Sequence, residues 1–263
     1  LNLFYFNLLL LKPIAYPEEA GLPIGGANFS RYLMLEVHYN NPELLKNQVD
    51  SSGIRLYYSK KLRKYDAAIL EIGLEYTDKN SIPPEQNQFD LMGYCTSECT
   101  WASLPPSGIT IFASQLHTHL TGKRVWTRHI RGGVELDELN RDNHYSPHFQ
   151  EIRKLKKPVH VLPGDALINV CRYDTSSRSN ITLGGFSISE EMCVNYIHYF
   201  PKSNLEVCKS SIDTQRLQAY FSYMKEYEGQ RTDPNKTVAD NYNSIKWNLN
   251  RSRFLHKLYE NSP

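Results

Sequence analysis

Short runs of β-branched and aromatic residues, separated by turn residues, fill most of this 263-residue chain. Val, Ile, Thr, Tyr and Phe favour pleated strands, and clusters such as Pro105-Pro106-Ser107-Gly108 and Pro163-Gly164-Asp165 favour turns. Closely spaced short strands of this kind are typical of a β-sandwich or jelly roll. We therefore predict an all-β, jelly-roll-like β-sandwich. The expected strands span residues 32–39, 54–58, 67–76, 108–119, 125–131, 133–138, 160–172, 179–187 and 192–200.

The pattern changes twice along the chain. A polar stretch from Asn41 to Gly53 is the best candidate for a linker between domains. After Cys208, residues 213–228 and 250–259 have helical periodicity, with a polar loop expected over 229–243. We predict three parts: 1–45 as the remnant of a preceding β-sandwich, 46–205 as the main sandwich domain, and 206–263 as a partly helical C-terminal extension.

Net charge and hydropathy argue against nucleic acid as a partner and against a membrane-spanning segment at residues 3–11. Thirty Lys and Arg against 28 Asp and Glu give a net charge of only +2, so nucleic-acid binding has no electrostatic support. Residues 3–11 are apolar but too short to cross a bilayer. The chain starts with Leu1 and has no secretory leader pattern, so we interpret it as a fragment.

The cysteines and glycosylation sequons favour an oxidising, secretory compartment. Cys95 and Cys99 form a Cys-x3-Cys pair, but no second close pair with His follows at zinc-finger spacing, which argues against a structural zinc site. Five cysteines leave one thiol unmatched within the chain. Four Asn-x-Ser/Thr sequons, at Asn28, Asn180, Asn235 and Asn250, accompany them.

Two histidines and a methionine are the residues with metal-binding potential. His117 and His119 are two residues apart, so on a strand both imidazoles project from one face. A bare His-x-His is more often a half-exposed pair on a sheet, and a lone Met192 is more often a core residue. Together they would form a His2Met site, and a thioether suits Cu(I) rather than zinc or magnesium.

Six longer stretches make the assignment more specific. They resemble the copper type II, ascorbate-dependent monooxygenases over about residues 12–260, and this family uses two copper ions on two β-sandwich domains. The stretches are YPEEAG (16–21), LEVHYNNP (35–42), DSSGIRLYY (50–58), IFASQLHTHLTG (111–122), DNHYSPHFQEI (142–152) and EEMCVNYIHYFP (190–201).

The resemblance implies roles for four residues. His117, His119 and Met192 match the ligands of the oxygen-activating copper, and His38 matches the third histidine of the electron-transfer copper. The other two ligands of the electron-transfer site are an adjacent His-His pair in the family, and this sequence contains no such pair. We therefore expect 1–40 to be the last strands of an otherwise missing N-terminal copper domain.

The family pattern also implies the disulfides. It joins Cys171 to Cys193, next to Met192, and Cys95 to Cys208, and it places the partner of Cys99 beyond Pro263. The cysteines that would link subunits in close relatives are absent, so we expect no covalent dimer, while a non-covalent homo-oligomer remains possible.

Two positions bear on the substrate. In the peptide-amidating branch of the family an Arg that grips a carboxylate stands at the position of Gln115, and an Asn stands at that of Val194. A neutral amide cannot form a bidentate ion pair, which favours a small amine substrate. Tyr196 and Tyr199 are candidate pocket residues, each as easily a sheet aromatic. We expect structural roles for His144, His148, His160 and His198.

The resemblance thus implies hydroxylation of the benzylic carbon of a phenylethylamine such as dopamine or tyramine, as in catecholamine biosynthesis. Copper, molecular oxygen and ascorbate would take part, in a secretory vesicle lumen or outside the cell, with membrane association possible in the full-length parent. Two alternatives stay open: a related monooxygenase with another substrate, and a catalytically silent, copper-binding secreted fragment. Copper stoichiometry with ascorbate-dependent oxygen uptake distinguishes an enzyme from a silent fragment.

Overall fold

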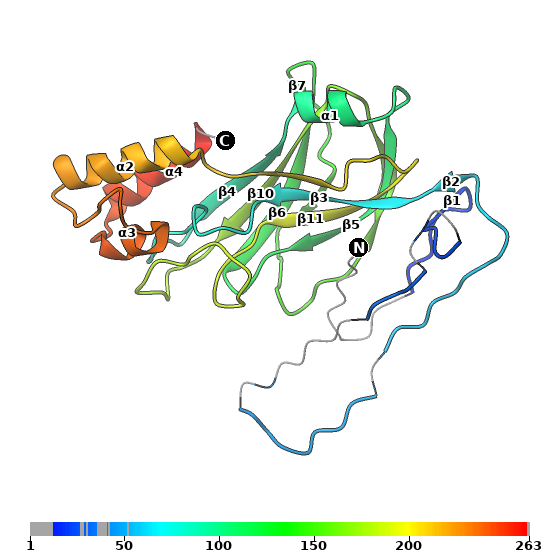
Figure 1. The fold of residues 1–263 in the computed structure, drawn as a ribbon, viewed down its shortest axis with the longest axis horizontal. Helices are drawn as coiled ribbons and strands as arrows, with labels where there is room; N and C mark the ends of the chain where they lie inside the picture. The colour runs from blue at the N-terminus through cyan, green and yellow to red at the C-terminus, as the bar shows by residue number, and fades with distance from the viewer. Residues whose placement is uncertain are drawn as a thin grey trace.

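Two antiparallel-rich sheets pack face to face in the computed structural model, which describes residues 13–26, 29, 31–35, 41, 43–51 and 53–261 (Figure 1). The first sheet has the order β4-β10-β6-β7, with β8 also beside β6, and the second has the order β12-β3-β11-β5-β9. The all-β sandwich prediction is therefore confirmed. The strands of the first sheet are β4 (Phe89–Cys95), β6 (Gly122–Arg131), β7 (Val134–Glu135), β8 (Asn140–Asp142) and β10 (Ala166–Tyr173). Those of the second are β3 (Ala68–Leu74), β5 (Ile109–His117), β9 (Arg153–Val161), β11 (Val194–Phe200) and β12 (Val207–Ser210).

Alternation along the strands divides the second sheet into two faces. Leu70 and Ile72 of β3 and Ile197 of β11 belong to one buried cluster with Leu167 of β10, which lies in the opposite sheet. Because successive side chains of a strand point to opposite faces, Glu71 and Tyr196 must lie on the outer face. The central strands of the second sheet, β3, β11 and β5, thus have one face in the sandwich core and the other on the outside of the sandwich.

Two disulfides fasten one sheet to the other. Cys95 of β4 is bonded to Cys208 of β12, and Cys171 of β10 is bonded to Cys193, which directly precedes β11. These are the two pairs that the resemblance implies. Cys99 is a half-buried free thiol, with its Sγ 3.3 Å from that of Cys208. The second disulfide fixes the start of β11 against the first sheet.

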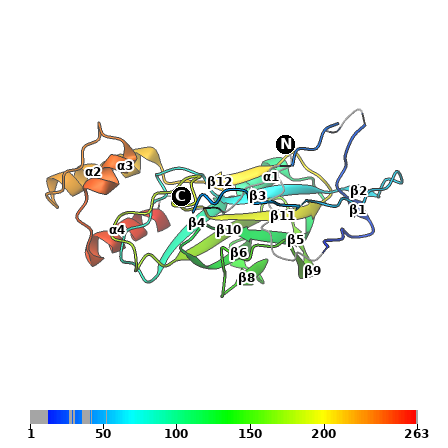
Figure 2. The same ribbon diagram turned by 90° about the horizontal axis from the view of Figure 1, so that it is seen from below.

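A helical extension packs against one end of the sandwich, at the left of Figures 1 and 2. It consists of α2 (Thr214–Glu226), α3 (Val238–Ser244) and α4 (Leu249–Glu260), and α1 (Ser97–Ser103) lies apart from it after β4. The three helices share their own core around Phe221, Tyr242 and Leu255. The hydroxyls of Tyr259 in α4 and Tyr242 in α3 both bond the Lys79 carbonyl, and Tyr259 also bonds Ser81, so both helices attach the extension to the sandwich.

The N-terminal part contacts the sandwich through several of its described residues. β1 (Ala20–Gly21) pairs in parallel with β2 (Tyr65–Asp66), and Tyr16 packs edge-on against Phe112 on the outer face of the second sheet. Between β1 and β2 the chain makes the long excursion seen in Figure 1, and many of its described apolar side chains are exposed. The exposed ones include Tyr32, Leu33, Met34, Leu35, Leu44, Leu45, Val49, Ile54, Leu56, Tyr57, Tyr58 and Leu62.

Several predicted elements differ from the structure. The strand predicted over 160–172 is two strands, the end of β9 and most of β10, because a turn lies at 162–165. Residues 179–187 make only isolated bridges, and 54–58 have no strand partner. The predicted loop 229–243 contains most of α3, and β4 and α1 had no prediction. The prediction for 32–39 lies partly outside the described residues, and 32–35 are exposed without strand pairing.

Candidate metal centre

The predicted ligands lie at one end of the second sheet, where β5 finishes and β11 begins. In the antiparallel register of β5 and β11, His117 is opposite Val194 and Gln115 is opposite Tyr196. Met192 lies two residues before Val194 and packs against Val194 and Tyr196. Since directly opposite residues share a face, His117, Met192 and Tyr196 belong to the outer face of this sheet.

The two imidazoles lie close to each other. Their ring centroids are 5.2 Å apart and the ring planes are nearly perpendicular, at 87°. The Tyr196 ring lies 6.2 Å from that of His117 and contacts the same small apolar cluster as Met192. The fold therefore brings Met192 into the neighbourhood of two imidazoles that precede it by 73 or more positions in the chain.

Each histidine is held through its Nδ1 atom. His117 Nδ1 is 2.5 Å from Oε1 of Gln150, and His119 Nδ1 is 2.9 Å from the backbone carbonyl of Glu190. Both partners are acceptors, so each Nδ1 carries the proton and donates it. In the neutral tautomer this makes Nε2 the nitrogen with a lone pair for a metal, the arrangement in which outer hydrogen bonds orient metal-binding imidazoles.

Burial keeps His117 in the form that can bind a metal. Loss of hydration lowers its pKa to about 4, although the hydrogen bond to Gln150 opposes this change. The imidazole is therefore neutral in the weakly acidic and neutral range. A protonated ring could not donate its Nε2 lone pair, so burial favours coordination.

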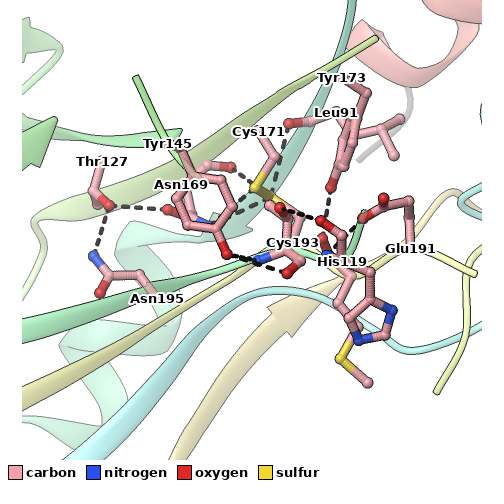
Figure 3. Close-up of a disulfide and its surroundings, with 12 residues drawn as sticks. Leu91, His119, Thr127, Tyr145, Asn169, Cys171, Tyr173, Glu191, Cys193 and Asn195 are labelled. Atoms are coloured by element: carbon pink, nitrogen blue, oxygen red, sulfur yellow. Dashed lines mark hydrogen bonds between the residues drawn. A yellow bond between two sulfur atoms is a disulfide. The ribbon is translucent and has the colours of Figure 1, made fainter. Parts of the chain in front are cut away.

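A buried carboxylate fixes the turn that carries His119. Glu191 Oε2 accepts a hydrogen bond from the backbone N–H of His119 at 2.9 Å (Figure 3). Its Oε1 accepts two from Thr121, from the backbone N–H and the hydroxyl, at 2.6 Å each. Burial raises the pKa of Glu191, while these three hydrogen bonds work to lower it. Tyr145 adds a second restraint, because its hydroxyl bonds both the N–H and the carbonyl of Thr118.

Met192 is held by its own backbone and by its neighbour. Its carbonyl accepts a 2.7 Å hydrogen bond from the buried hydroxyl of Tyr173. Cys193 is bonded to Cys171, and Asn169 Nδ2 lies 3.4 Å from Cys193 Sγ; Figure 3 shows this disulfide between Tyr145 and Glu191. Glu191, Met192 and Cys193 are thus anchored in succession, which limits where the thioether can go.

The donor set suits copper. Two neutral imidazoles with a thioether match a soft ion such as Cu(I), and the Nδ1 contacts supply the orientation that such a site needs. Within the described part of the chain, the one cluster of three His, Cys, Asp or Glu side chains close enough to share an ion is Cys95, Cys99 and Cys208. Two of its sulfurs are joined in a disulfide, so they cannot coordinate as thiolates.

Tyr199 is a correction. We predicted it as a pocket residue, but it is fully buried in the core between the sheets, where its hydroxyl bonds Ser203 and the carbonyl of Leu205. The three-residue separation of Tyr196 and Tyr199 puts them on opposite faces of β11. Only Tyr196 lies beside the candidate ligands.

Other predicted site residues are placed as follows. His38 and Asn28 lie outside the described residues. Asn180, Asn235 and Asn250 are exposed, as glycosylation would require. His198 is buried on the outer face and bonds the Tyr16 hydroxyl at 2.8 Å, away from the candidate ligands, which agrees with a structural role.

Sequence reasoning missed the residues that hold the ligands. Gln150 and Tyr145 lie in the stretch 142–152, which carried part of the family resemblance but received no role. Glu191 stands next to Met192 and was read only as part of a motif. An acceptor near each imidazole could be expected in principle, but its place depends on how the loops fold over the strand end.

The helices of the structure are all short. Among the described residues, no helix has both the length and the apolar character that a bilayer crossing requires.

Comparison with known proteins agrees with the geometry. Residues 65–221 match the C-terminal domain, and residues 11–46 the N-terminal domain, of the copper type II ascorbate-dependent monooxygenases. The chain is 54% identical to dopamine beta-hydroxylase of Equus caballus over 254 residues, 96% of this chain and 42% of the relative. It is 52% identical to tyramine beta-hydroxylase of Caenorhabditis briggsae, over 89% of this chain and 39% of the relative. It is 37% identical to human DBH-like monooxygenase protein 1, over 95% of this chain and 43% of the relative.

The chain spans about two fifths of the length of these relatives. The match to the C-terminal model nonetheless covers more than half of the chain and includes His117, His119 and Met192. The chain belongs to the copper type II, ascorbate-dependent monooxygenase family.

Proposed function

We propose that His117, His119 and Met192 bind one copper ion, through Nε2 of each imidazole and the thioether sulfur. The observation that carries this proposal is the pair of Nδ1 hydrogen bonds, to Gln150 and to the Glu190 carbonyl, because both rings then offer the same nitrogen. Met192 contributes from the neighbouring strand start, where it packs with Val194 and Tyr196.

The proposed activity is hydroxylation of the benzylic carbon of a phenylethylamine, with ascorbate as the electron donor. Copper would supply the activation of molecular oxygen, which no protein side chain provides. Support comes from family membership and from relatives whose names specify dopamine and tyramine as substrates.

The chain's own residues would position the substrate and keep the site dry. Gln115, opposite Tyr196, and Val194, opposite His117, carry no charge on the outer face beside the ligands. A neutral amide cannot clamp a carboxylate bidentately, so this surface favours an amine over a substrate that carries a carboxylate. The Tyr196 ring, buried except for about 5% of its surface, would pack against the aromatic ring of the substrate.

Electron transfer would need the second copper site of the family. His38 is the proposed ligand that this chain contributes to it, together with an N-terminal copper domain that supplies an adjacent histidine pair. The proposal further places the protein in the secretory pathway, in a vesicle lumen or outside the cell, glycosylated and able to form a homo-oligomer. Two disulfides support an oxidising compartment.

Two other interpretations share the same metal site. A secreted chain that binds copper without hydroxylating anything would need the same ligands. A related monooxygenase with another substrate differs only in the residues around Tyr196.

Copper stoichiometry and oxygen uptake test these readings together. The purified chain is titrated with Cu(I), and ascorbate-dependent oxygen uptake is then followed with tyramine, dopamine and phenylethylamine. Binding of one Cu(I) ion per chain, and its loss in His117→Ala, would support the proposed site. Oxygen uptake that increases when an amine is added would support the proposed activity. Binding that persists unchanged in both His117→Ala and His119→Ala would refute the site.

A further inference from the structure

A chain of polar contacts runs across the outer face of the second sheet and ends beside the candidate metal centre. It links Lys209 of β12, Glu71 of β3, Tyr76 just beyond β3, and Tyr196 of β11. In the sheet register Glu71 is opposite Tyr196, which is in turn opposite Gln115. The four side chains therefore form one continuous patch on the face that carries His117.

The contacts themselves are close. Lys209 Nζ pairs with Glu71 Oε2 and lies 3.6 Å from the centre of the Tyr76 ring. The Tyr76 hydroxyl is 3.2 Å from Glu71 Oε2 and 3.3 Å from the Tyr196 hydroxyl. The Lys209 side chain is only 9% exposed and that of Glu71 25%, so solvent does little to screen the ion pair.

The chemistry of the groups fixes the direction of each hydrogen bond. An ammonium can only donate and a carboxylate can only accept, so both Lys209 and Tyr76 donate to Glu71. Burial raises the pKa of Tyr76, which keeps it a neutral phenol with a single proton to give. Because that proton goes to Glu71, the 3.3 Å contact requires Tyr196 to donate to Tyr76.

The Tyr196 hydroxyl therefore has no proton left for a ligand. A phenol has one donor hydrogen and two acceptor lone pairs, and the hydrogen is committed to Tyr76. Toward the metal centre the hydroxyl can act only as an acceptor. An acceptor attracts a ligand with an N–H or O–H group, such as an ammonium, and disfavours a carboxylate, whose oxygens would face a lone pair.

We propose that Lys209, Glu71 and Tyr76 are positioning residues that hold the Tyr196 hydroxyl as a hydrogen-bond acceptor, so that the site selects aromatic ligands bearing a donor group over those bearing a carboxylate. This inference rests on the proposed function in one respect, that ligands enter beside His117. It adds three residues to the determinants of specificity: Lys209 of β12, Glu71 of β3 and Tyr76 just beyond β3. Phe186 extends the same wall to the surface, because its ring packs edge-on against Tyr76 at 5.0 Å and is 73% exposed.

Tyr76→Phe tests the direction of the relay without changing any charge. The probes are 2-phenylethylamine and 3-phenylpropionate, which share a ring and differ in the end group, and their dissociation constants are measured by calorimetry with and without Cu(I). In the unchanged chain the amine binds more tightly. In Tyr76→Phe the Tyr196 proton is released, and we expect the ratio of the two affinities to fall about tenfold, the effect of one hydrogen bond to a charged group.

Three further variants make the test specific. Tyr94→Phe removes a phenol from the other sheet, where the hydroxyl contacts only Met92 in the described contacts, and should leave the ratio unchanged. Tyr196→Phe should itself lower the ratio, and adding Tyr76→Phe to it should have no further effect, since Tyr76 acts through Tyr196. Lys209→Met should lower the ratio less than Tyr76→Phe, because Glu71 still accepts from Tyr76.

The outcomes are separable from those of the proposed function. Copper stoichiometry is measured for each variant, and the relay predicts that it stays unchanged in Tyr76→Phe. If the parent chain did not bind copper, only the metal site would be refuted, because the affinities for the amine and the carboxylate are also compared without copper. Any of three results would overturn the relay. The first is an unchanged ratio of amine to carboxylate affinity in Tyr76→Phe, and the second is an equal effect of Tyr76→Phe in the presence and absence of the Tyr196 hydroxyl. The third is failure of the parent chain to bind the amine more tightly than the carboxylate.

Discussion

The carboxylate of Glu191 accepts a 2.9 Å hydrogen bond from the backbone N–H of His119, so a residue next to one candidate ligand fixes the backbone of another. Its other oxygen holds Thr121. The two halves of the centre, from β5 and from the start of β11, are thus joined by one buried side chain. The strand pairing brings the halves together, and Glu191 sets their alignment.

Replacement of Glu191 should therefore weaken copper binding without removing a ligand. In Glu191→Gln one oxygen becomes an NH2 group that faces backbone donors, so the His119 turn must shift. We expect Cu(I) affinity to fall about 10- to 100-fold, the usual effect of losing a residue that orients metal ligands. Competition with a chromophoric Cu(I) chelator measures it. Glu190→Gln is the matched control, because the Glu190 side chain accepts from Ser187 and its carbonyl, which bonds His119, remains.

The Cys171–Cys193 disulfide should contribute to stability and to the position of Met192. Its cysteines are 22 residues apart, and a bridge of that span stabilises by about 3 kcal/mol through loss of entropy in the unfolded chain. The double variant Cys171→Ala/Cys193→Ala should lower the free energy of unfolding in urea by about this amount. Cys99→Ala, which removes a half-buried free thiol, should change it far less; equal losses would contradict the assignment.

Asp165 should make the sandwich sensitive to acid. Burial alone would raise its pKa, but hydrogen bonds from Arg131, the Leu162 N–H and His129 outweigh that and lower the pKa to about 2. A carboxyl with a lowered folded-state pKa stabilises the fold above its ordinary value of 3.8, and this contribution is lost as the pH falls to about 2.

The shift corresponds to about 2 kcal/mol. Unfolding free energy measured between pH 5 and pH 2 should therefore drop by about that much more for the parent chain than for Asp165→Asn, which lacks the carboxyl. Asp137→Asn, at an exposed position of the loop before β8, should keep the parent's pH profile. A profile for Asp165→Asn parallel to the parent's would show that Asp165 is not responsible.

Tyr259 should fasten the helical extension to the sandwich. Its hydroxyl lies within hydrogen-bond distance of Ser81 N–H, at 3.1 Å, and of the carbonyls of Lys79 and Ser81, at 3.0 Å each. Tyr259→Phe leaves the buried Ser81 N–H without this acceptor, while the Lys79 carbonyl keeps its hydrogen bond from Tyr242, so we expect a loss of about 1 to 3 kcal/mol. Thermal unfolding measures the change. Tyr227→Phe, at a site 75% exposed, should be neutral, and a similar loss there would contradict this role.

The sequence carried enough to predict the sandwich, because alternation and turn residues are local patterns, whereas the candidate ligand set came from the family resemblance and stays a prediction. Alternation and turn residues place β3, β5, β6 and β11. The strand predicted over 108–119 ends at His117, and His119 lies in the segment that follows it. The same alternation, applied to Tyr196 and Tyr199, separates them by face, so Tyr199 could have been excluded without a structure.

The rest depends on contacts distant in the chain. Gln150 reaches His117 from a loop 33 residues away, and Glu191 reaches Thr121 across 70 residues. The Lys209, Glu71 and Tyr76 relay needs the pairing of β12 with β3, and β12 is a short strand that carried no recognisable pattern. Hydrogen-bond partners of this kind are set by register and loop conformation, which single-residue preferences do not encode.

X-ray absorption spectroscopy of the Cu(I)-loaded chain identifies the atoms bound to copper. With His117, His119 and Met192 as ligands, we expect two imidazole nitrogens and one sulfur around the copper. The sulfur contribution should disappear in Met192→Leu and stay unchanged in Met224→Leu, because the Met224 side chain is buried among the helices. A spectrum without sulfur, or one that Met192→Leu leaves unchanged, would contradict this set of ligands.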